Sequence, residues 1–267
     1  MRLATLCGMC AVFAALFGTP LTATLFALEV ISVGVIYYSA LVPCIVASLF
    51  ALEMANIFGI APTNFDVVIE PISELMLLKV SALAVVCSLM STVFCLSMHK
   101  TEHLFANLIK NPYLRIAAGG ALVVLITAIL GTGDYNGAGM NIIKRAIEEG
   151  QAKPDAFFWK LILTAITIGC GFKGGEVVPT FFIGATLGCV LGSLLGIPAG
   201  FAAAIGLICV FCGAVNCPVA SIVLSIELFG STDLVYFALA CGIAYMLSGY
   251  FGLYSSQKIM YSKLRAE

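Results

Sequence analysis

Residues 169–188, with the sequence GCGFKGGEVVPTFFIGATLG, have the residue types and the spacing of an anion site. Four glycines within 169–175 end one helix and allow the backbone to turn sharply, and the following residues open another helix. The first turn of a helix offers unpaired N–H groups and the positive end of the helix dipole, which bind an anion without a full positive charge. We therefore predict an anion-binding or permeation site at Gly174, Gly175, Glu176, Val177, Val178 and Pro179.

The composition places this site in a membrane. Of the 267 residues, 61% are hydrophobic and 10% are charged, whereas a soluble domain carries about a quarter charged residues. No charged residue occurs over 177–226, and only two occur over 3–65. A net charge of −1 provides no basic surface for nucleic acid. The sequence predicts a polytopic membrane protein and excludes a soluble enzyme and a nucleic-acid binder.

Glu176 has two interpretations. An intramembrane carboxyl is costly unless it is used, and beside an anion it could carry a coupled proton. Alternatively, it is an acid favoured by the dipole at the start of its helix. Glu29 and Glu227 each follow a helix-opening proline by nine positions, after Pro20 and Pro218, which indicates a duplicated unit. We expect these two acids to be structural and to cap or bridge helices.

Glycines and prolines divide the apolar runs into an all-α pattern of unequal, broken and tilted helices. Several runs are too short to cross a bilayer. Short, broken helices of this kind are typical of ion sites in transporters. Basic residues at 100–115 and 258–265 predict a cytoplasmic C-terminus. The expected helices cover 3–17, 20–38, 41–58, 71–98, 112–130, 137–149, 154–169, 179–195, 200–213, 218–229, 232–250 and 254–266.

Other polar features indicate no catalytic, cofactor or metal site. The eleven cysteines lie in apolar runs, where free cysteine behaves as a small buried hydrophobe. His99 and His103 share a helix face but stand at a charged helix end, so we expect both to be solvated. Residues 131–139 predict a glycine-rich turn, because no phosphate-loop lysine follows them. Residues 144–160 predict a solvated loop.

Three motifs resemble the CLC chloride channel and transporter family, and they occur along the chain in the same order as in that family. They are the Gly-Gly-x-x-x-Pro pattern at 174–179 with Gly184 and Gly188, the segment FGTPL before Glu29, and Leu-Tyr-Ser at 253–255. The resemblance implies a CLC-like fold and a homodimer through residues 20–58 and 200–250. It also implies that Tyr254 is an anion ligand. Gly184 and Gly188 allow close packing on a neighbouring helix.

Two residues point to the fluoride/proton antiporter subgroup. Glu176 and Val177 match that subgroup's Gly-Gly-Glu-Val-Thr-Pro pattern, with Val178 replacing the threonine. Chloride/proton exchangers carry a second acid after the one at Glu29, and this chain has Val30 there. The resemblance implies part of a proton-coupled fluoride exporter in a prokaryotic inner membrane, with Glu176 as the proton-coupling residue. A chloride channel or a chloride/proton exchanger is the alternative.

The repeat predicts that part of the family's architecture lies outside this chain. In the second copy, Pro179 precedes Pro218 by 39 residues. The equivalent of Pro179 in the first copy would lie 39 residues before Pro20, which is upstream of Met1. We interpret the chain as one transmembrane domain with an incomplete inverted repeat, in which residues 1–60 end the first copy and 61–267 form the second. The family's gating glutamate belongs to the absent stretch. A further alternative is therefore a truncated, non-transporting fragment that needs a separate N-terminal half.

Overall fold

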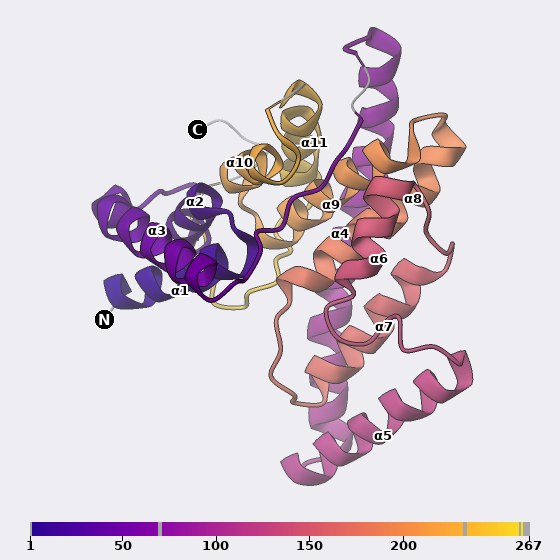
Figure 1. The fold of residues 1–267 in the computed structure, drawn as a ribbon. Helices are drawn as coiled ribbons and strands as arrows, with labels where there is room; N and C mark the ends of the chain where they lie inside the picture. The colour runs from indigo at the N-terminus through magenta and orange to yellow at the C-terminus, as the bar shows by residue number, and fades with distance from the viewer. Residues whose placement is uncertain (1, 69–70, 232–233, 262, 264–267) are drawn as a thin grey trace.

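The computed structural model describes residues 2–68, 71–231, 234–261 and 263, and these form a helical protein (Figure 1). Four helical segments are long and apolar enough to cross a membrane: Tyr38–Ile57, Glu74–Leu108, Pro112–Leu130 and Val177–Leu195. Five further apolar helices are shorter, in agreement with the predicted broken architecture. The helices are α1 (Arg2–Phe17), α2 (Pro20–Glu29), α3 (Leu41–Ile57), α4 (Glu74–Leu108), α5 (Pro112–Leu130), α6 (Met140–Lys144), α7 (Ala156–Gly169), α8 (Val177–Leu195), α9 (Ala199–Val215), α10 (Pro218–Phe229) and α11 (Leu234–Leu247).

Two expected helices are corrected. The helix predicted over 20–38 ends at Glu29, and Ser32–Val33 then forms a short strand, β1. The helix predicted over 254–266 is wrong, because Lys258–Ile259 forms strand β2, which pairs in parallel with β1. The rest of that prediction falls partly on residues 262 and 264–267, outside the described residues. Backbone pairing with a segment more than 200 residues away has overridden the local sequence pattern.

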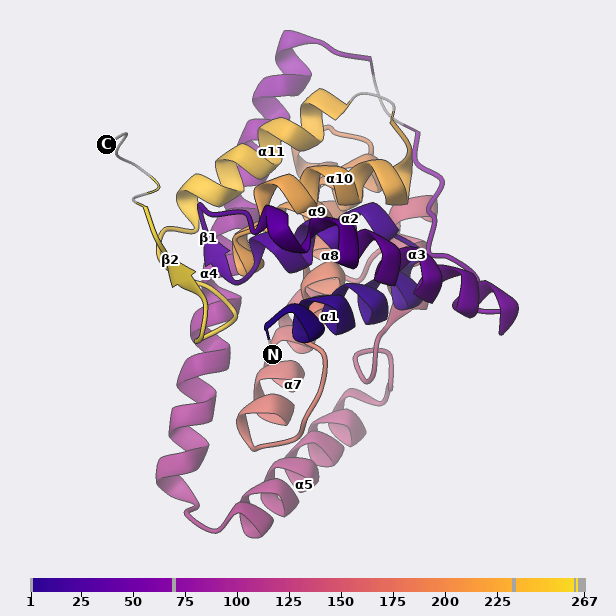
Figure 2. The same cartoon turned by 90° about the vertical axis from the view of Figure 1, so that its left-hand side faces the viewer.

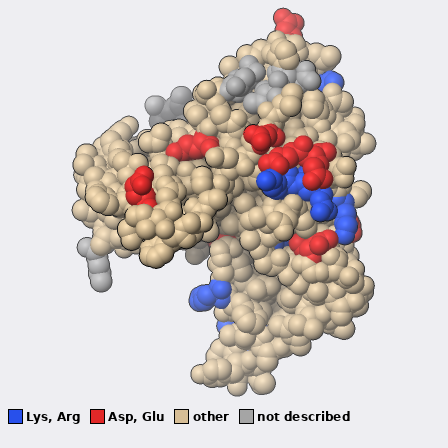
Figure 3. Space-filling view, viewed as in Figure 1, with Lys and Arg blue, Asp and Glu red and all other residues tan. Residues whose placement is uncertain are grey.

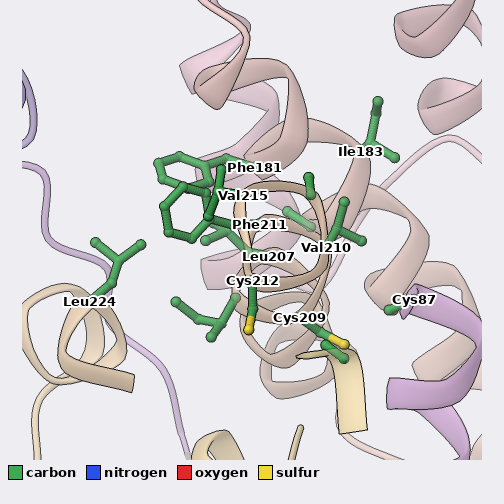
Figure 4. Packing of buried hydrophobic residues seen from close by; sticks show 14 of the residues in the cluster. Cys87, Phe181, Ile183, Leu207, Cys209, Val210, Phe211, Cys212, Val215 and Leu224 are labelled. Atoms are coloured by element: carbon green, nitrogen blue, oxygen red, sulfur yellow. The ribbon is translucent and has the colours of Figure 1, made fainter. Parts of the chain in front are cut away.

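Helix α9 lies at the centre of the fold, and α4, α8, α10 and α11 contact it (Figures 1 and 2). Every residue over 201–217 is buried. This part of the range predicted to form a dimer interface is therefore not a surface, because the chain's own helices cover it. Figure 4 shows the side chains of Phe181 from α8 and Phe211 from α9 packed together, with ring centroids 5.2 Å apart.

Glycines set the close crossing of α8 and α9. A Cβ atom at Gly184 would lie 2.3 Å from the carbonyl oxygen of Gly206, and one at Gly188 would lie 2.2 Å from that of Ala202. The two backbones touch because these residues carry no side chain. The expected close packing at Gly184 and Gly188 is confirmed.

Helices α2 and α10 cap each other with their acids, and Figure 2 shows the two helices side by side. The Glu227 carboxylate accepts hydrogen bonds from the backbone N–H groups of Leu21 (3.0 Å) and Thr22 (2.8 Å) at the start of α2. The Glu29 carboxylate accepts them from Val219 (3.3 Å) and Ala220 (3.0 Å) at the start of α10. The structural interpretation of both acids is confirmed.

We expect Glu29→Ala to lower the free energy of unfolding by about 3 kcal/mol, since it leaves two N–H groups of α10 without their charged acceptor. Equilibrium unfolding in mixed micelles measures this change. Glu53→Ala, which removes an exposed acid from α3, is the control. Equal stability of the two variants would contradict a capping role for Glu29.

The glycine-rich turn over 131–139 joins α5 to α6 as predicted, but the solvated loop expected over 144–160 needs correction. Arg145–Glu149 is a π-helical turn, and α7 begins at Ala156. Lys160 is 2% exposed, and its ammonium donates hydrogen bonds to the carbonyl oxygens of Tyr135 and Gly137. It therefore fastens the turn to α7.

The other charged groups of this region do lie at the surface. Figure 3 shows acidic and basic side chains gathered in one area of this face, with separate charged side chains elsewhere on it. Lys153 Nζ lies 3.1 Å from Asp134 Oδ2, and this hydrogen bond lowers the pKa of the Asp134 carboxyl. This exposed ion pair links the glycine-rich turn to the loop before α7.

Candidate functional site

The loop between α7 and α8 positions the predicted anion motif. Helix α7 ends at Gly169, where a Cβ atom would lie 2.7 Å from the Thr101 side chain of α4. Gly171 has φ +110°, a conformation that side chains with a Cβ atom rarely adopt. The chain therefore turns tightly after α7, and residues 174–176 lead into α8.

Glu176 is the N-cap residue of α8, with φ −99° and ψ −18°, and its side chain makes no capping hydrogen bond. This distinguishes it from Ser73 and Asn111, whose side chains accept hydrogen bonds from the first turns of α4 and α5. The Glu176 carboxyl is half-buried and does not satisfy the backbone of its own helix. Glu176 thus lies at the positive end of the α8 dipole without capping the helix through its side chain, and its role as the proton-coupling residue stays a prediction.

Glu176 and Tyr254 line one cavity, although 78 positions separate them in the sequence. The cavity has a volume of about 200 Å³. It is lined by residues from α4, α7, the start of α8 and the C-terminal segment: Met98, His99, Glu102, Ile168, Glu176, Leu253, Tyr254, Ser255 and Ser256. Two acids, an imidazole and three hydroxyl groups thus meet beside the N-terminus of α8.

Backbone and side-chain hydrogen bonds hold the C-terminal segment that carries Tyr254. The N–H of Leu253 donates to Ala214 O (2.9 Å), and the Asn216 amide donates to Phe251 O (2.9 Å). Asn216 adopts φ +58° at the end of α9, which aims the chain toward α10. The segment is thereby fixed to the buried helix α9.

His99 is half-buried, whereas the sequence predicted a solvated side chain. It is half-buried in the cavity, and its Nε2 lies 2.9 Å from the carbonyl oxygen of Gly252. His103, one turn further along α4, is exposed as expected. The prediction of a solvated pair is wrong for His99, because the C-terminal segment folds back over it.

The other predicted motif residues lie beside the cavity wall and not in it. Gly174 and Gly175 are exposed, and a Cβ atom on either would meet no atom within 4 Å. Val177 and Val178 are half-buried against the core, and Pro179 is buried. Their assignment to the anion pathway remains a prediction.

Sequence reasoning missed His99 and Glu102 as residues of the site. The signal that could have found them is their spacing of three, which places them on one face at the end of a long apolar helix. Within the part of the chain that the structure describes, no group of three or more His, Cys, Asp or Glu residues is arranged to hold a metal ion.

A match to a known protein family shows to which family the chain belongs. The sequence pattern of the family described as "Voltage gated chloride channel" matches residues 1–249. The chain belongs to the voltage-gated chloride channel family. Among its curated relatives, a "Chloride/fluoride channel protein" of Pseudomonas syringae pv. tomato is 37% identical, over 98% of this chain and 59% of the relative.

Solved structures of two antiporters share the fold. The crystal structure of a CLC-type fluoride/proton antiporter matches with a TM-score of 0.91 and 33% identity, over 94% of this chain and 64% of that one. A slow cyanobacterial Cl⁻/H⁺ antiporter matches with a TM-score of 0.72 at 20% identity, and this likeness concerns the fold alone. This voltage-gated chloride channel family member spans about three-fifths of the length of these relatives.

Proposed function

We propose that this chain forms part of a proton-coupled fluoride exporter. The observation that carries the proposal is Glu176, which stands at the N-terminus of α8, leaves that helix uncapped and faces a cavity with Tyr254. Similarity to a chloride/fluoride channel protein and to a fluoride/proton antiporter supports the same function.

Each residue of the motif has a part in the proposed transport. The exposed glycines Gly174 and Gly175 leave the approach to the first turn of α8 open, and the N–H groups of Val177 and Val178 point out of that turn as donors. Pro179, in the first turn of α8, has no N–H to donate and has a fixed φ that suits the helix. The Tyr254 hydroxyl adds a donor, which suits fluoride because this ion is a strong hydrogen-bond acceptor.

Glu176 carries the coupled proton in this proposal. Hydrogen fluoride has an acid strength close to that of a carboxylic acid, so a proton is readily exchanged between the two. When protonated, the Glu176 carboxyl donates a hydrogen bond to the ion, and when ionised it repels the ion. Proton transfer at Glu176 thereby alternates binding and release.

A chloride/proton exchanger is the second candidate, and the region of Glu29 disfavours it. The neighbour of Glu29 is Val30, an apolar side chain that is 5% exposed. Both Glu29 oxygens accept hydrogen bonds from α10. An inner proton relay beside Glu29 would need a second acid there.

The proposed assembly follows from the surface and from the extent of the match. Helix α3 presents an exposed apolar face that includes Val42, Phe50 and Ile57, which suits a homodimer through α2, α3, α10 and α11. We place residues 1–60 at the end of a first repeat and 61–267 in the second, in a prokaryotic inner membrane with the C-terminus in the cytoplasm. A segment corresponding to the uncovered part of the relatives completes the pathway.

The test measures fluoride and chloride efflux from liposomes with ion-selective electrodes. We expect no fluoride efflux from the chain alone, and efflux of fluoride in preference to chloride when it is co-expressed with the uncovered segment of the Pseudomonas relative, here termed the complemented protein. Preferential chloride efflux would support the second candidate. Rapid fluoride efflux from the chain alone would contradict the need for a second segment, and no efflux from either would favour a non-transporting fragment.

A further inference from the structure

The cavity beside Glu176 connects this acid to the protein surface. Glu102 is exposed, whereas His99 and Glu176 are half-buried, and all three side chains line the same space. The titratable groups that face the cavity are these three and Tyr254, from α4, the start of α8 and the C-terminal segment. One cavity thus joins an exposed acid, Glu102, to the half-buried Glu176.

The hydrogen bond of His99 fixes the tautomer of its neutral imidazole. The partner of Nε2 is the Gly252 carbonyl oxygen, 2.9 Å away, and a carbonyl oxygen only accepts. Nε2 therefore carries a hydrogen atom, and Nδ1 is the nitrogen of the neutral ring that can accept a proton. A backbone carbonyl that orients one nitrogen in this way prepares the other for proton transfer.

The cavity is large enough to bridge these groups with water. A water molecule occupies about 30 Å³ in the liquid, so a polar cavity of about 200 Å³ holds several of them. Serine hydroxyls at 255 and 256 add donors and acceptors to its wall. Protons can thus pass between side chains that do not touch.

We propose that His99 and Glu102 relay protons between solvent and Glu176, an inference that rests on the proposed function of Glu176. A proton from solvent reaches Glu102 and passes through water to Nδ1 of His99, which becomes an imidazolium. The imidazolium then releases the Nδ1 proton through water to a Glu176 carboxylate oxygen, and the neutral Nε2–H imidazole is restored. The reverse sequence returns the proton, and no other reactant is needed.

A purely structural role for His99 predicts a different result from the same substitution. His99→Gln keeps an N–H donor that can reach the Gly252 carbonyl but removes the nitrogen that accepts a proton. If His99 only anchors the C-terminal segment, this variant should behave as the unsubstituted protein does. If His99 is a relay, proton delivery to Glu176 should slow.

Time-resolved infrared spectroscopy of the chain in lipid nanodiscs tests the relay without any transport. A flash releases protons from a caged acid, and the rise of the protonated carboxyl band of Glu176 is followed, with Glu176→Gln identifying that band. We expect His99→Gln to slow the rise about tenfold or more. His103→Gln is the matched control, because it removes the exposed imidazole one turn away and should leave the rate unchanged.

A rise in His99→Gln as fast as in the unsubstituted protein would overturn the relay. Proton-coupled fluoride efflux of the complemented protein gives the second readout, in which His99→Gln should slow efflux and change its pH profile. If the infrared rate falls but no protein transports fluoride, the relay stands and the proposed function fails. If transport occurs and His99→Gln changes neither readout, the function stands and the relay fails.

Discussion

Glu176→Gln is expected to lower proton-coupled fluoride efflux by the complemented protein about 100-fold, because the amide cannot take up the coupled proton. The substitution keeps the size of the side chain and its place at the N-cap of α8. Since the carboxyl makes no capping hydrogen bond, the fold should be preserved. A fluoride electrode and a pH electrode, read together on the same liposomes, measure the loss of both ion movements.

Glu74→Gln is the matched control for this experiment. Glu74 is an exposed acid in the first turn of α4, so its removal changes the same kind of helix-terminal charge away from the cavity. Efflux by this variant should equal that of the unsubstituted protein. Coupled efflux that survives in Glu176→Gln would show that the proton uses another residue.

Gly184→Val is expected to lower the free energy of unfolding by about 3 kcal/mol or more, since the new side chain must enter a packed helix crossing. A Cβ atom at this position would lie 2.3 Å from the Gly206 carbonyl oxygen and 2.8 Å from the Leu207 Cα atom. Both are backbone atoms, which cannot give way without moving α9. Equilibrium unfolding and size-exclusion profiles in detergent report the change.

Gly242→Ala provides the contrast for Gly184. Gly242 lies within α11, and a Cβ atom there would meet no atom within 4 Å. Alanine is the better helix former by about 1 kcal/mol, so this variant should be at least as stable as the unsubstituted protein. If Gly184→Val folded as well as Gly242→Ala, the close approach of α8 and α9 would be wrong.

Features that depend on local spacing could be predicted from the sequence. Gly184 and Gly188 indicate a close helix crossing because residues four apart share a helix face. The equal offsets from Pro20 to Glu29 and from Pro218 to Glu227 indicate equivalent acids, and the reciprocal capping of α2 and α10 agrees with this.

Features that depend on distant contacts could not be predicted. The sequence predicts a solvated His99, but its ring is hydrogen-bonded to the carbonyl oxygen of Gly252, 153 positions later. The sequence predicts that Lys160 lies in a solvated loop, but its ammonium donates hydrogen bonds to two carbonyl oxygens of the glycine-rich turn. The sequence predicts a helix over residues 254–266, but within that range Lys258–Ile259 pairs with β1 as a strand. In each case tertiary contact outweighs local preference.

Proton movement driven by a fluoride gradient tests whether Glu176 couples fluoride export to proton uptake. Liposomes that contain the complemented protein are loaded with fluoride, at equal pH inside and outside and with the membrane potential clamped at zero. We expect protons to move into the liposomes as fluoride leaves, and we expect Glu176→Gln to stop both movements. Fluoride efflux with no accompanying proton movement would contradict this coupling.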